Sequence, residues 1–321
     1  MSGCAEVLKP TWTRWARPRC RRDACSPSFA NCPPAKSPVE VDGKNAASIR
    51  SGQSFFKILG LPEEEFPPLP KFENAKVVTM RQKDLRDGLR KTAYAISTDE
   101  TRYVLNGVLF SFKENKLTLV ATDGRRLAMV DIELEFPRSH EADIIVPTKA
   151  VTELQRLLTD DGEVKISVGS GQIAFDLNNT LLVSKLIEGN YPNYKQVIPS
   201  EAKERVTLER ETFLNSLRRV SLLASDKSNS IKLNFSKNNI EITANTPEVG
   251  EARESLPVAY KGRDFSIAFN PEFLMAPLRN LTEDEVFLRS HRRDESGRFE
   301  NPDAISLRAD ADARQLVRRA A

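Results

Sequence analysis

The residues able to do chemistry are few in this chain, and they do not form a catalytic set. The histidines His140 and His291 lie far apart in the sequence, and neither belongs to a Ser/His/Asp or Cys/His pattern. The paired carboxylates Asp160 and Asp161 fall in an expected loop, where solvation explains them. Asp123 stands alone in a turn, where aspartate is favoured because it bonds the nearby backbone. The sequence therefore predicts no active site.

Lysine and arginine support a different chemistry, the electrostatic binding of anions. The chain has 48 Lys and Arg against 45 Asp and Glu, so its net charge is only +3 and it is not coated in basic charge. One surface can still be basic. The segment RQKDLRDGLRKTAYAI predicts a helix with Leu85 and Leu89 on its apolar stripe and basic residues on its other faces. Helix faces are therefore where we expect a basic surface.

The first tenth of the chain differs from the rest. Its cysteines lack the Cys-x-x-Cys or Cys/His pairs that a zinc site requires, so we expect no metal. Residues 1–37 show no helix or strand periodicity, and their prolines oppose the amphipathic helix of an organelle-targeting peptide. No sequence pattern suggests a membrane span or a secretory signal, which predicts a cytoplasmic protein. The cysteines are Cys4, Cys20, Cys25 and Cys32.

From Val39 onward the pattern changes to strands and amphipathic helices. VEVDGKNAASI and QSFFKILGL predict two strands around a turn at Asp42-Gly43. AKVVTM, the helix described above, and then NGVLFSF, KLTLVAT and RRLAMVDIEL predict a strand, a helix and an antiparallel meander, which is a βαβββ unit. Residues 142–189 and 205–258 repeat that order, and FSIAFN begins a fourth copy. We therefore expect an α+β protein built from repeated units.

A repeat at a fixed offset supports this organisation. The segment NGVLFSFKENKLTLVAT (106–122) lies over NSIKLNFSKNNIEITAN (229–245) at a constant offset of 123 residues. Diverged copies of one supersecondary unit leave such a signal, so we predict domains of about 125 residues, each made of two units. The paired positions are Phe112 with Phe235, Asn115 with Asn238, Leu117 with Ile240 and Ala121 with Ala244.

Several stretches resemble one known family. RYVLNGVLF, VATDGRRLA, IIVPTKAV, VSKLIEGNYPNYKQVIP and ITANTPEVGEARE are similar to the bacterial beta sliding clamp, the beta subunit of DNA polymerase III. The resemblance implies a DNA-clamp fold in which three domains per subunit, and two subunits head to tail, close a ring around duplex DNA. It implies a processivity factor that tethers the replicative polymerase, an accessory subunit of a nucleotidyltransferase complex with no catalytic site and no cofactor.

The resemblance also implies a surface that faces DNA. A protein that slides needs attraction to phosphates without base readout, so helices lining the hole should present lysine and arginine. Solvation alone also explains charged residues on a helix, and that alternative stays open for each of them. Arg102 and Tyr103 match family positions near DNA. The helix candidates are Lys83, Arg86, Arg90, Lys149, Arg156, Arg218, Arg219 and Arg279.

Two further surfaces follow from the resemblance. One is a shallow apolar pocket that takes a short peptide from polymerases and the clamp loader, where a groove receives apolar anchors and its rim holds the peptide backbone. The alternative is that Leu127 and Val197 are ordinary core residues. The second surface is the subunit interface, where Leu222 and Leu223 match apolar positions. The pocket candidates are Thr122, Gly124, Arg126, Leu127, Pro192 and Val197.

The two ends depart from the family. We expect an irregular segment at 1–37, a remnant of clamp domain 1 at 38–71, domain 2 at 72–200, an incomplete domain 3 at 201–288 and an irregular tail at 289–321. Permitted codons for the tail, read one nucleotide later, can encode an ending that contains YVLMPMR. We hypothesise that both ends are frame-shifted clamp sequence, which gene sequencing tests. Without a complete first domain, closure of the head-to-tail ring becomes doubtful.

Two other classes of function stay open. The chain could be an adaptor that keeps only peptide binding through Arg126, Leu127 and Pro192. It could also be an enzyme whose site the sequence does not reveal. Retention on circular but not linear DNA would favour the clamp, and peptide binding without DNA retention would favour the adaptor. Hydrolysis or transfer that is abolished by one carboxylate substitution would favour the enzyme.

Overall fold

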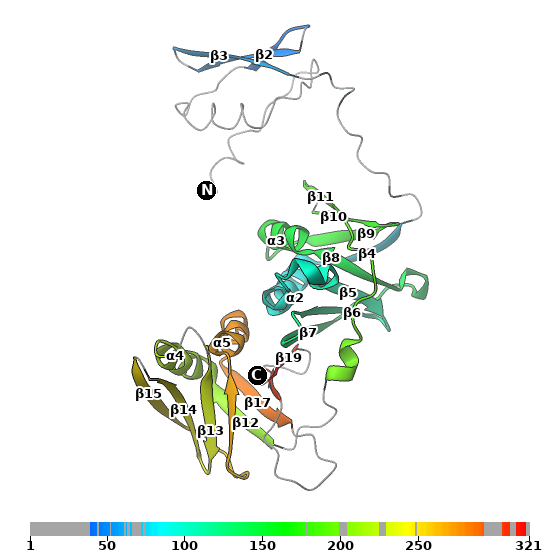
Figure 1. The fold of residues 1–321 in the computed structure, drawn as a ribbon. Coiled ribbons are helices and arrows are strands. Elements are labelled where there is room, and N and C mark those ends of the chain that lie inside the picture. Colours follow the sequence, from blue (N-terminus) through cyan, green and yellow to red (C-terminus); the bar gives the residue numbers. More distant parts are fainter. Residues whose placement is uncertain are drawn as a thin grey trace. The chain divides into compact units, whose positions relative to one another are not determined.

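The computed structural model describes residues 39–43, 45–51, 53–60, 75–177, 179–198, 204–224, 229–247, 249–291, 304–308 and 313–318, together with 62, 65 and 72. The chain divides into two units, Met1–Lys71 and Phe72–Ala321 (Figure 1). The predictions of an irregular segment at 1–37 and of its cysteines lie outside the described residues.

The described part of the first unit is a small antiparallel sheet. Its strands β1 (Val39–Val41), β2 (Ala46–Ser51) and β3 (Ser54–Leu59) lie in the order β1-β2-β3. The predicted turn at Asp42-Gly43 joins β1 to β2, and the Asp42 carboxylate accepts a hydrogen bond of 2.9 Å from the Ala46 amide. The sheet therefore has one strand more than the two that the sequence predicts.

The second part of the chain, Phe72–Ala321, begins with the two predicted βαβββ repeats, which form the central domain. Their order is as expected, except that the first helix ends at Thr92 and continues as the short 3-10 turn η2 (Ala93–Ala95). The first βαβββ repeat is β4 (Lys76–Arg81), α2 (Gln82–Thr92), β5 (Gly107–Lys113), β6 (Lys116–Thr122) and β7 (Arg126–Glu133). The second is β8 (Ala142–Pro147), α3 (Thr148–Leu157), β9 (Glu163–Val168), β10 (Gln172–Asp176) and β11 (Leu181–Lys185). Further 3-10 turns are η3 (Glu100–Leu105), η4 (Arg138–His140) and η5 (Tyr194–Val197).

The same order continues in the C-terminal domain. A third unit comprises β12 (Glu204–Glu209), α4 (Arg210–Ser221), β13 (Ile231–Ser236), β14 (Asn239–Thr246) and β15 (Gly250–Pro257). The fourth comprises β16 (Phe265–Phe269), α5 (Pro271–Asn280), β17 (Glu285–His291), β18 (Ala304–Arg308) and β19 (Ala313–Arg318). The prediction of an irregular tail at 289–321 is therefore wrong for β18, β19 and the end of β17. Backbone amides and carbonyls at an open sheet edge recruit partners whatever the side-chain pattern, and the prediction used only that pattern.

In the central and C-terminal domains a pair of helices packs over the strands. The strand orders of the sheets are β11-β10-β9-β4, β15-β14-β13-β16 and β12-β17-β18-β19-β7-β6-β5-β8. Helices α2 and α3 contact each other over the central strands, and α4 contacts α5 over the C-terminal ones (Figure 1). Apolar residues of the helices and of the strands fill the space between each helix pair and its strands, and they form the two large cores.

The repeat at an offset of 123 residues is confirmed in the coordinates. Phe112 and Phe235 are each 1% exposed in their own cores. Asn115 and Asn238 sit in the two equivalent turns with φ of 54° and 59°, a left-handed conformation that asparagine tolerates better than most residues. The equivalent strands also pair in the same register.

Candidate functional site

The central sheet is buried on both faces, and its second face leads to the candidate site. Along β5 the residues Leu109 and Phe110 point to opposite faces, yet they are 5% and 0% exposed. Phe110 belongs to the core under the helices, whereas Leu109 belongs to a separate apolar cluster. We call this second set the outer cluster. It contains Leu109, Val120, Leu127, Met129 and Ile145.

A segment that follows β11 covers the outer cluster. Ile187 joins it by pairing with Ile145, and Tyr191, Tyr194 and Val197 pack against it. Burial raises the pKa of the Tyr194 hydroxyl, with a smaller contribution from nearby carboxylates. The segment matches the stretch EGNYPNYKQVIP, and its prolines and asparagines favour irregular backbone rather than another strand. This irregular segment therefore covers part of the central-sheet face that carries the outer cluster, which we call the outer face.

The predicted pocket residues come from two sources that the fold brings together. Leu127 belongs to the outer cluster, Val197 packs against it, and Pro192 is exposed on the covering segment. Leu127 is 4% exposed, so its side chain lies in the floor rather than on an open surface. Thr122 ends β6, Gly124 lies in the turn that follows, and Arg126 begins β7, where Leu127 pairs with Thr122. Strand β19 pairs with the other side of β7 and puts Leu316 opposite Leu127.

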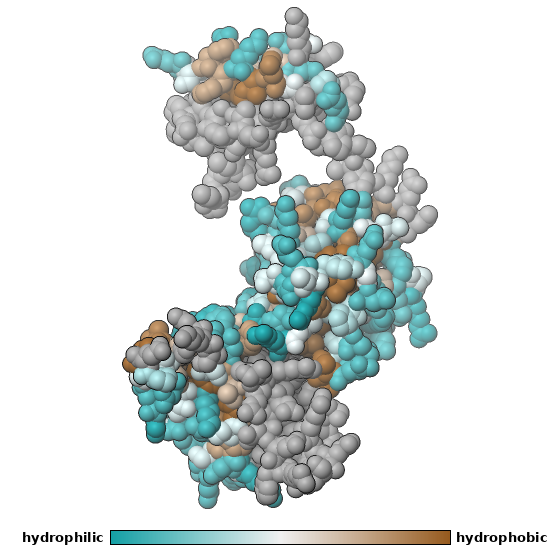
Figure 2. Space-filling model, in the orientation of Figure 1, coloured by the Kyte–Doolittle hydropathy of each residue, from teal (hydrophilic) through white to brown (hydrophobic). Residues whose placement is uncertain are grey.

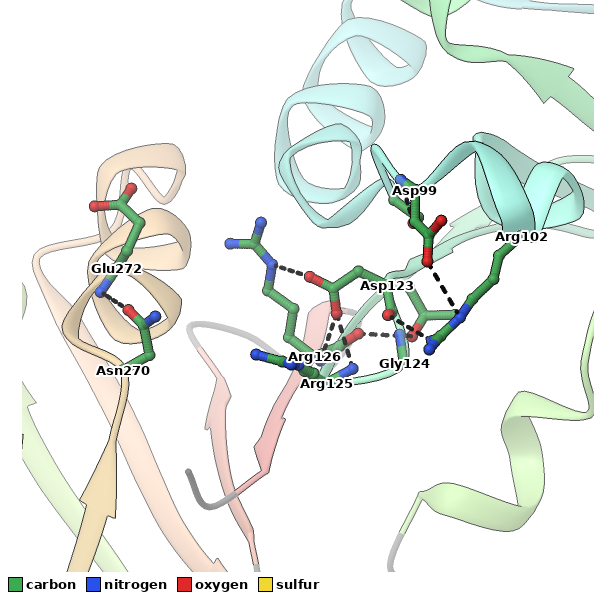
Figure 3. Close-up of polar contacts among 10 residues, drawn as sticks. Asp99, Arg102, Asp123, Gly124, Arg125, Arg126, Asn270 and Glu272 are labelled. Carbon is green, nitrogen blue, oxygen red and sulfur yellow. Dashed lines mark hydrogen bonds and ion pairs between the residues drawn. The ribbon is translucent and has the colours of Figure 1, made fainter. Parts of the chain in front are cut away.

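Asp123 organises the turn between β6 and β7 (Figure 3). Its Oδ1 accepts hydrogen bonds of 2.9 Å from the amides of Arg125 and Arg126, and its Oδ2 accepts one of 3.0 Å from Arg126 Nε. The sequence explained Asp123 by backbone bonding alone, and the structure adds the ion pair. Gly124 has φ of +88°, and a Cβ there would meet Arg102 Nη1 at 2.8 Å. A residue other than glycine would therefore be strained and would displace Arg102.

Arg126 is held by contacts that the sequence did not reveal. Its guanidinium carbon lies 4.9 Å from the ring centre of Phe273 on α5 and 5.7 Å from that of Tyr94 in η2. Both distances suit cation–π attraction. Burial raises the pKa of Tyr94 far above its usual value, although the Arg126 charge lowers it in part. Asp123, Tyr94 and Phe273 are therefore positioning residues, and only Asp123 carried a local signal in the sequence.

The predicted DNA-facing residues are at the surface, but most have acidic partners. Arg90 lies 3.2 Å from Asp87, and the other pairs are within one helix or reach a neighbouring loop or strand. Lys83 and Lys149 are exposed and have no ion pair among the described residues. The pairs are Arg86 with Asp160, Arg156 with Glu153 at 2.6 Å, Arg219 with Glu254, Arg279 with Glu272 at 2.6 Å, and Arg102 with Asp99 at 3.6 Å. Arg218 bonds Asn215 at 3.2 Å, and Tyr103 is 59% exposed.

Comparison with known proteins identifies the family. The description "DNA polymerase III beta subunit, central domain" matches residues 79–193, and "DNA polymerase III beta subunit, C-terminal domain" matches residues 195–305. This chain belongs to the beta sliding clamp family. A beta sliding clamp of Chlamydia muridarum is 37% identical over 250 residues, which is 78% of this chain and 68% of that one. That of Bacillus subtilis is 33% identical over 258 residues, 79% of this chain and 69% of the relative.

Solved sliding clamps share the fold. The DNA polymerase sliding clamp of Bacillus subtilis superimposes with a TM-score of 0.83 at 30% identity, covering 92% of this chain and 77% of that one. A Bartonella birtlesii clamp bound to griselimycin gives 0.81 at 31% identity, covering 91% and 78%. The prediction of an α+β DNA-clamp fold is confirmed. The match spans only 60% of the Chlamydia trachomatis relative.

The predicted interface residues differ from each other in exposure. Leu222 is 80% exposed at the end of α4, whereas Leu223 is partly buried against the C-terminal core. The Leu223 carbonyl also accepts a hydrogen bond of 2.7 Å from Thr246 Oγ1. Leu222 is thus exposed to solvent, while the Leu223 carbonyl is tied to Thr246, and a role of either residue in a subunit interface stays a prediction.

Among the residues considered for catalysis, His140 and Asp160 have structural partners. His140 Nδ1 lies 3.0 Å from the Val77 carbonyl, and Asp160 pairs with Arg86. Within the described ranges no group of three or more His, Cys, Asp or Glu could hold a metal ion. In the same ranges no helix is long and apolar enough to cross a membrane.

Proposed function

We propose that this chain works as a sliding clamp that encircles duplex DNA and tethers a replicative polymerase, as an accessory subunit without a catalytic step of its own. The observation that carries the proposal is the match of two consecutive clamp domains over residues 79–305, in a fold that superimposes on solved clamps. A cytoplasmic location, a head-to-tail homodimer and clamp-loader partners belong to the same proposal.

The DNA side of the proposal depends on α2, α3, α4 and α5. Basic residues outnumber acidic ones in α2, α3 and α4 and equal them in α5. An exposed ion pair contributes only about 0–1 kcal/mol, so a phosphate can replace a carboxylate partner such as Glu272 at little cost. Lys83 and Lys149 need no such exchange. Contacts of this kind hold the backbone without reading bases, which suits sliding.

The peptide side depends on the outer cluster and the turn beside it. An apolar anchor would pack against Leu127 and Val197, while Arg126 and the backbone near Gly124 would fix the rim. Relatives are solved with griselimycin bound, and we propose that the same kind of ligand occupies this groove. Affinity should come from few anchors because small interfaces concentrate binding energy in buried apolar contacts.

Loading onto circular DNA tests the proposal. The purified chain, a clamp loader and ATP are mixed with nicked circular DNA, and half of the sample is then linearised with a restriction enzyme. A clamp stays on the circle during gel filtration, runs off the linear form, and lengthens polymerase products on a primed circular template. Equal loss from both DNA forms, with no gain in product length, would contradict the proposal.

An adaptor that keeps only peptide binding is the second candidate. One observation favours it: Arg126, Leu127 and Pro192 all come from the central domain, so the groove depends little on ring closure. Griselimycin binding by a chain that is not retained on circular DNA would select this candidate. The Leu222→Asp variant sharpens the distinction, because it should reduce retention on circles and leave griselimycin binding unchanged.

A further inference from the structure

A cavity lies beside the predicted peptide groove. Its volume is about 340 Å³. The side chains that line it come from β5, β8 and the covering segment, whereas Arg126 and Leu127 come from β7. Pro192 lines the cavity and is also a groove residue. The cavity is therefore a neighbour of the groove that shares one wall with it.

The cavity has an apolar floor and a polar end. Leu109 and Ile145 pair directly across β5 and β8 and belong to the outer cluster. Tyr191 and Tyr194 stand over them from the covering segment. Further along the same two strands, Ser111 and Asp143 pair in register, and Lys113 and Lys195 complete the polar end. A ligand there would rest an aliphatic body on the floor and present a polar group to the lysines.

The charged groups at the polar end of the cavity differ in whether they have an ion-pair partner. Asp143 Oδ1 accepts a hydrogen bond of 2.6 Å from Ser111, and its Oδ2 pairs with Lys113. Burial alone would raise the pKa of Asp143, but the bonds from Lys113 and Ser111 outweigh it, and Lys113 and Lys195 lower the pKa further. Asp143 is thus ionised and satisfied at neutral pH. Lys195 is exposed and has no ion pair among the described residues, so it is the available cation.

The backbone of the covering segment is also available to a ligand. From Glu188 to Asn193, within the described chain, no amide donates to another backbone carbonyl. Asn190 and Asn193 add exposed side-chain amides along the cavity rim. Backbone amides that lack a backbone acceptor can bond an extended peptide that lies beside them.

We propose that this cavity binds an acidic side chain of the same peptide that anchors in the groove, with Lys195 as the counter-ion. The proposal rests on the proposed function, because it assumes that a partner peptide occupies the groove. Two strand spacings separate β7 from β5, which is roughly 10 Å. An extended chain covers that distance in about three residues. The acidic residue should therefore lie about three positions from the apolar anchor.

Peptide binding to the full chain tests the proposal. The probe is a fluorescein-labelled peptide from a bacterial replicative polymerase subunit, chosen because griselimycin displaces it from this chain. Glutamate or glutamine is placed three residues before or after its apolar anchor. For one of these two positions we expect glutamate to bind about two- to fivefold more tightly than glutamine, as expected for one partly screened ion pair. Lys195→Gln should remove that preference and leave the glutamine peptide unchanged.

The matched control is Lys185→Gln, an exposed lysine on β11 that does not line the cavity. It should keep the glutamate preference. No preference at either position, or an equal loss with Lys185→Gln and Lys195→Gln, would overturn the cavity proposal and leave the groove intact. Failure of every peptide to bind the unmodified chain would overturn the groove as well, so the two failures are distinguishable.

Discussion

The central and C-terminal sheets are copies of one unit, but only the central copy is buried on both faces. At an offset of 123 residues, Leu109, Val120 and Ile145 correspond to Lys232, Thr243 and Ala268. Both triplets pair across their strands in the same register. The first triplet is 5%, 0% and 3% exposed, whereas Lys232 is exposed and the other two are intermediate. Equivalent backbone positions are therefore buried in the central copy and more exposed in the C-terminal copy.

The two copies differ in their outer faces rather than in their cores. Inner-face residues in both copies form ordinary cores, which every copy needs in order to fold. The outer face of a sheet can simply contact water. This is the case in the C-terminal copy, whose strands alternate between buried and more exposed residues. The central copy places an apolar outer cluster under a separate covering segment. The predicted groove and the neighbouring cavity both lie there, and we therefore propose the central copy as the docking domain.

The largest effect should be the same in both copies. Phe112→Ala and Phe235→Ala each remove a ring that is 1% exposed, so each should lower the free energy of unfolding of its domain by about 3–5 kcal/mol. Urea unfolding followed by circular dichroism measures this. A cost under about 1 kcal/mol in one copy would show that its inner core is not packed as described.

The next effect should differ between copies. Val120→Thr buries a hydroxyl in the outer cluster and should cost about 1–3 kcal/mol of unfolding free energy. Thr243→Val, its counterpart in the C-terminal copy, should change stability by no more than about 0.5 kcal/mol. The same urea experiment compares the two. Similar costs would remove the distinction between a covered and an open outer face.

A smaller effect should separate positioning of the groove from stability. Asp123→Ala removes acceptors of three hydrogen bonds around Arg126, and Thr246→Val removes one bond at the equivalent position. Each should lower stability by about 1–2 kcal/mol. Only Asp123→Ala should weaken griselimycin binding, measured by isothermal titration calorimetry. Asp123→Asn, which can still accept the amide bonds, should recover most of the stability but only part of the affinity.

The smallest effect concerns an ion pair that joins the copies. Lys91 on α2 lies 3.0 Å from Glu283 beyond α5. Burial alone would raise the pKa of Glu283, but the hydrogen bond and charge of Lys91 and the backbone amides of Thr282 and Glu283 together outweigh it, so the folded pKa is lowered. A lowered pKa stabilises the fold above the unfolded-state pKa of glutamate, about 4.3, and that contribution disappears as pH falls through the folded value. Glu283→Gln should therefore cost about 0.5–1 kcal/mol at pH 7.

Thermal melts across pH check this prediction. The difference in unfolding free energy between the unmodified chain and Glu283→Gln should shrink toward zero as the solution becomes more acidic than the ordinary pKa of glutamate. Glu285→Gln, an exposed residue on β17, serves as the control and should show little difference at any pH. A gap that persists in acid would mean that Glu283 acts through packing rather than charge.

Most of the fold could be predicted because its signals are local or repeated. Alternation predicted the strands, and the offset pairing of Asn115 with Asn238 predicted two equivalent turns, which their positive φ angles confirm. The outer-face residues Leu109 and Val120 were also readable as apolar where Lys232 and Thr243 are polar. Strands β18 and β19 were missed because edge pairing depends on backbone groups rather than on side-chain pattern.

The site was predictable only in part. The resemblance supplied Arg126 and Leu127, but nothing local indicates that Phe273 packs on Arg126, because α5 is remote in sequence. The ion pairs of Arg219 and Arg279 likewise depend on tertiary placement. Lys195 was not singled out, because one lysine in a polar segment has no periodic signal, and only the cavity gives it a context. Whether the basic residues contact DNA stays a prediction.

The central claim is that ligands dock on the outer face of the central copy, and methyl NMR tests it most directly. Griselimycin is titrated into the chain with labelled leucine, isoleucine and valine methyl groups. We predict the largest shifts at Leu127 and Val197, with the C-terminal core methyls of Leu233 and Ile242 nearly unchanged. Largest shifts in the C-terminal copy, or no shift at saturating ligand, would contradict the account.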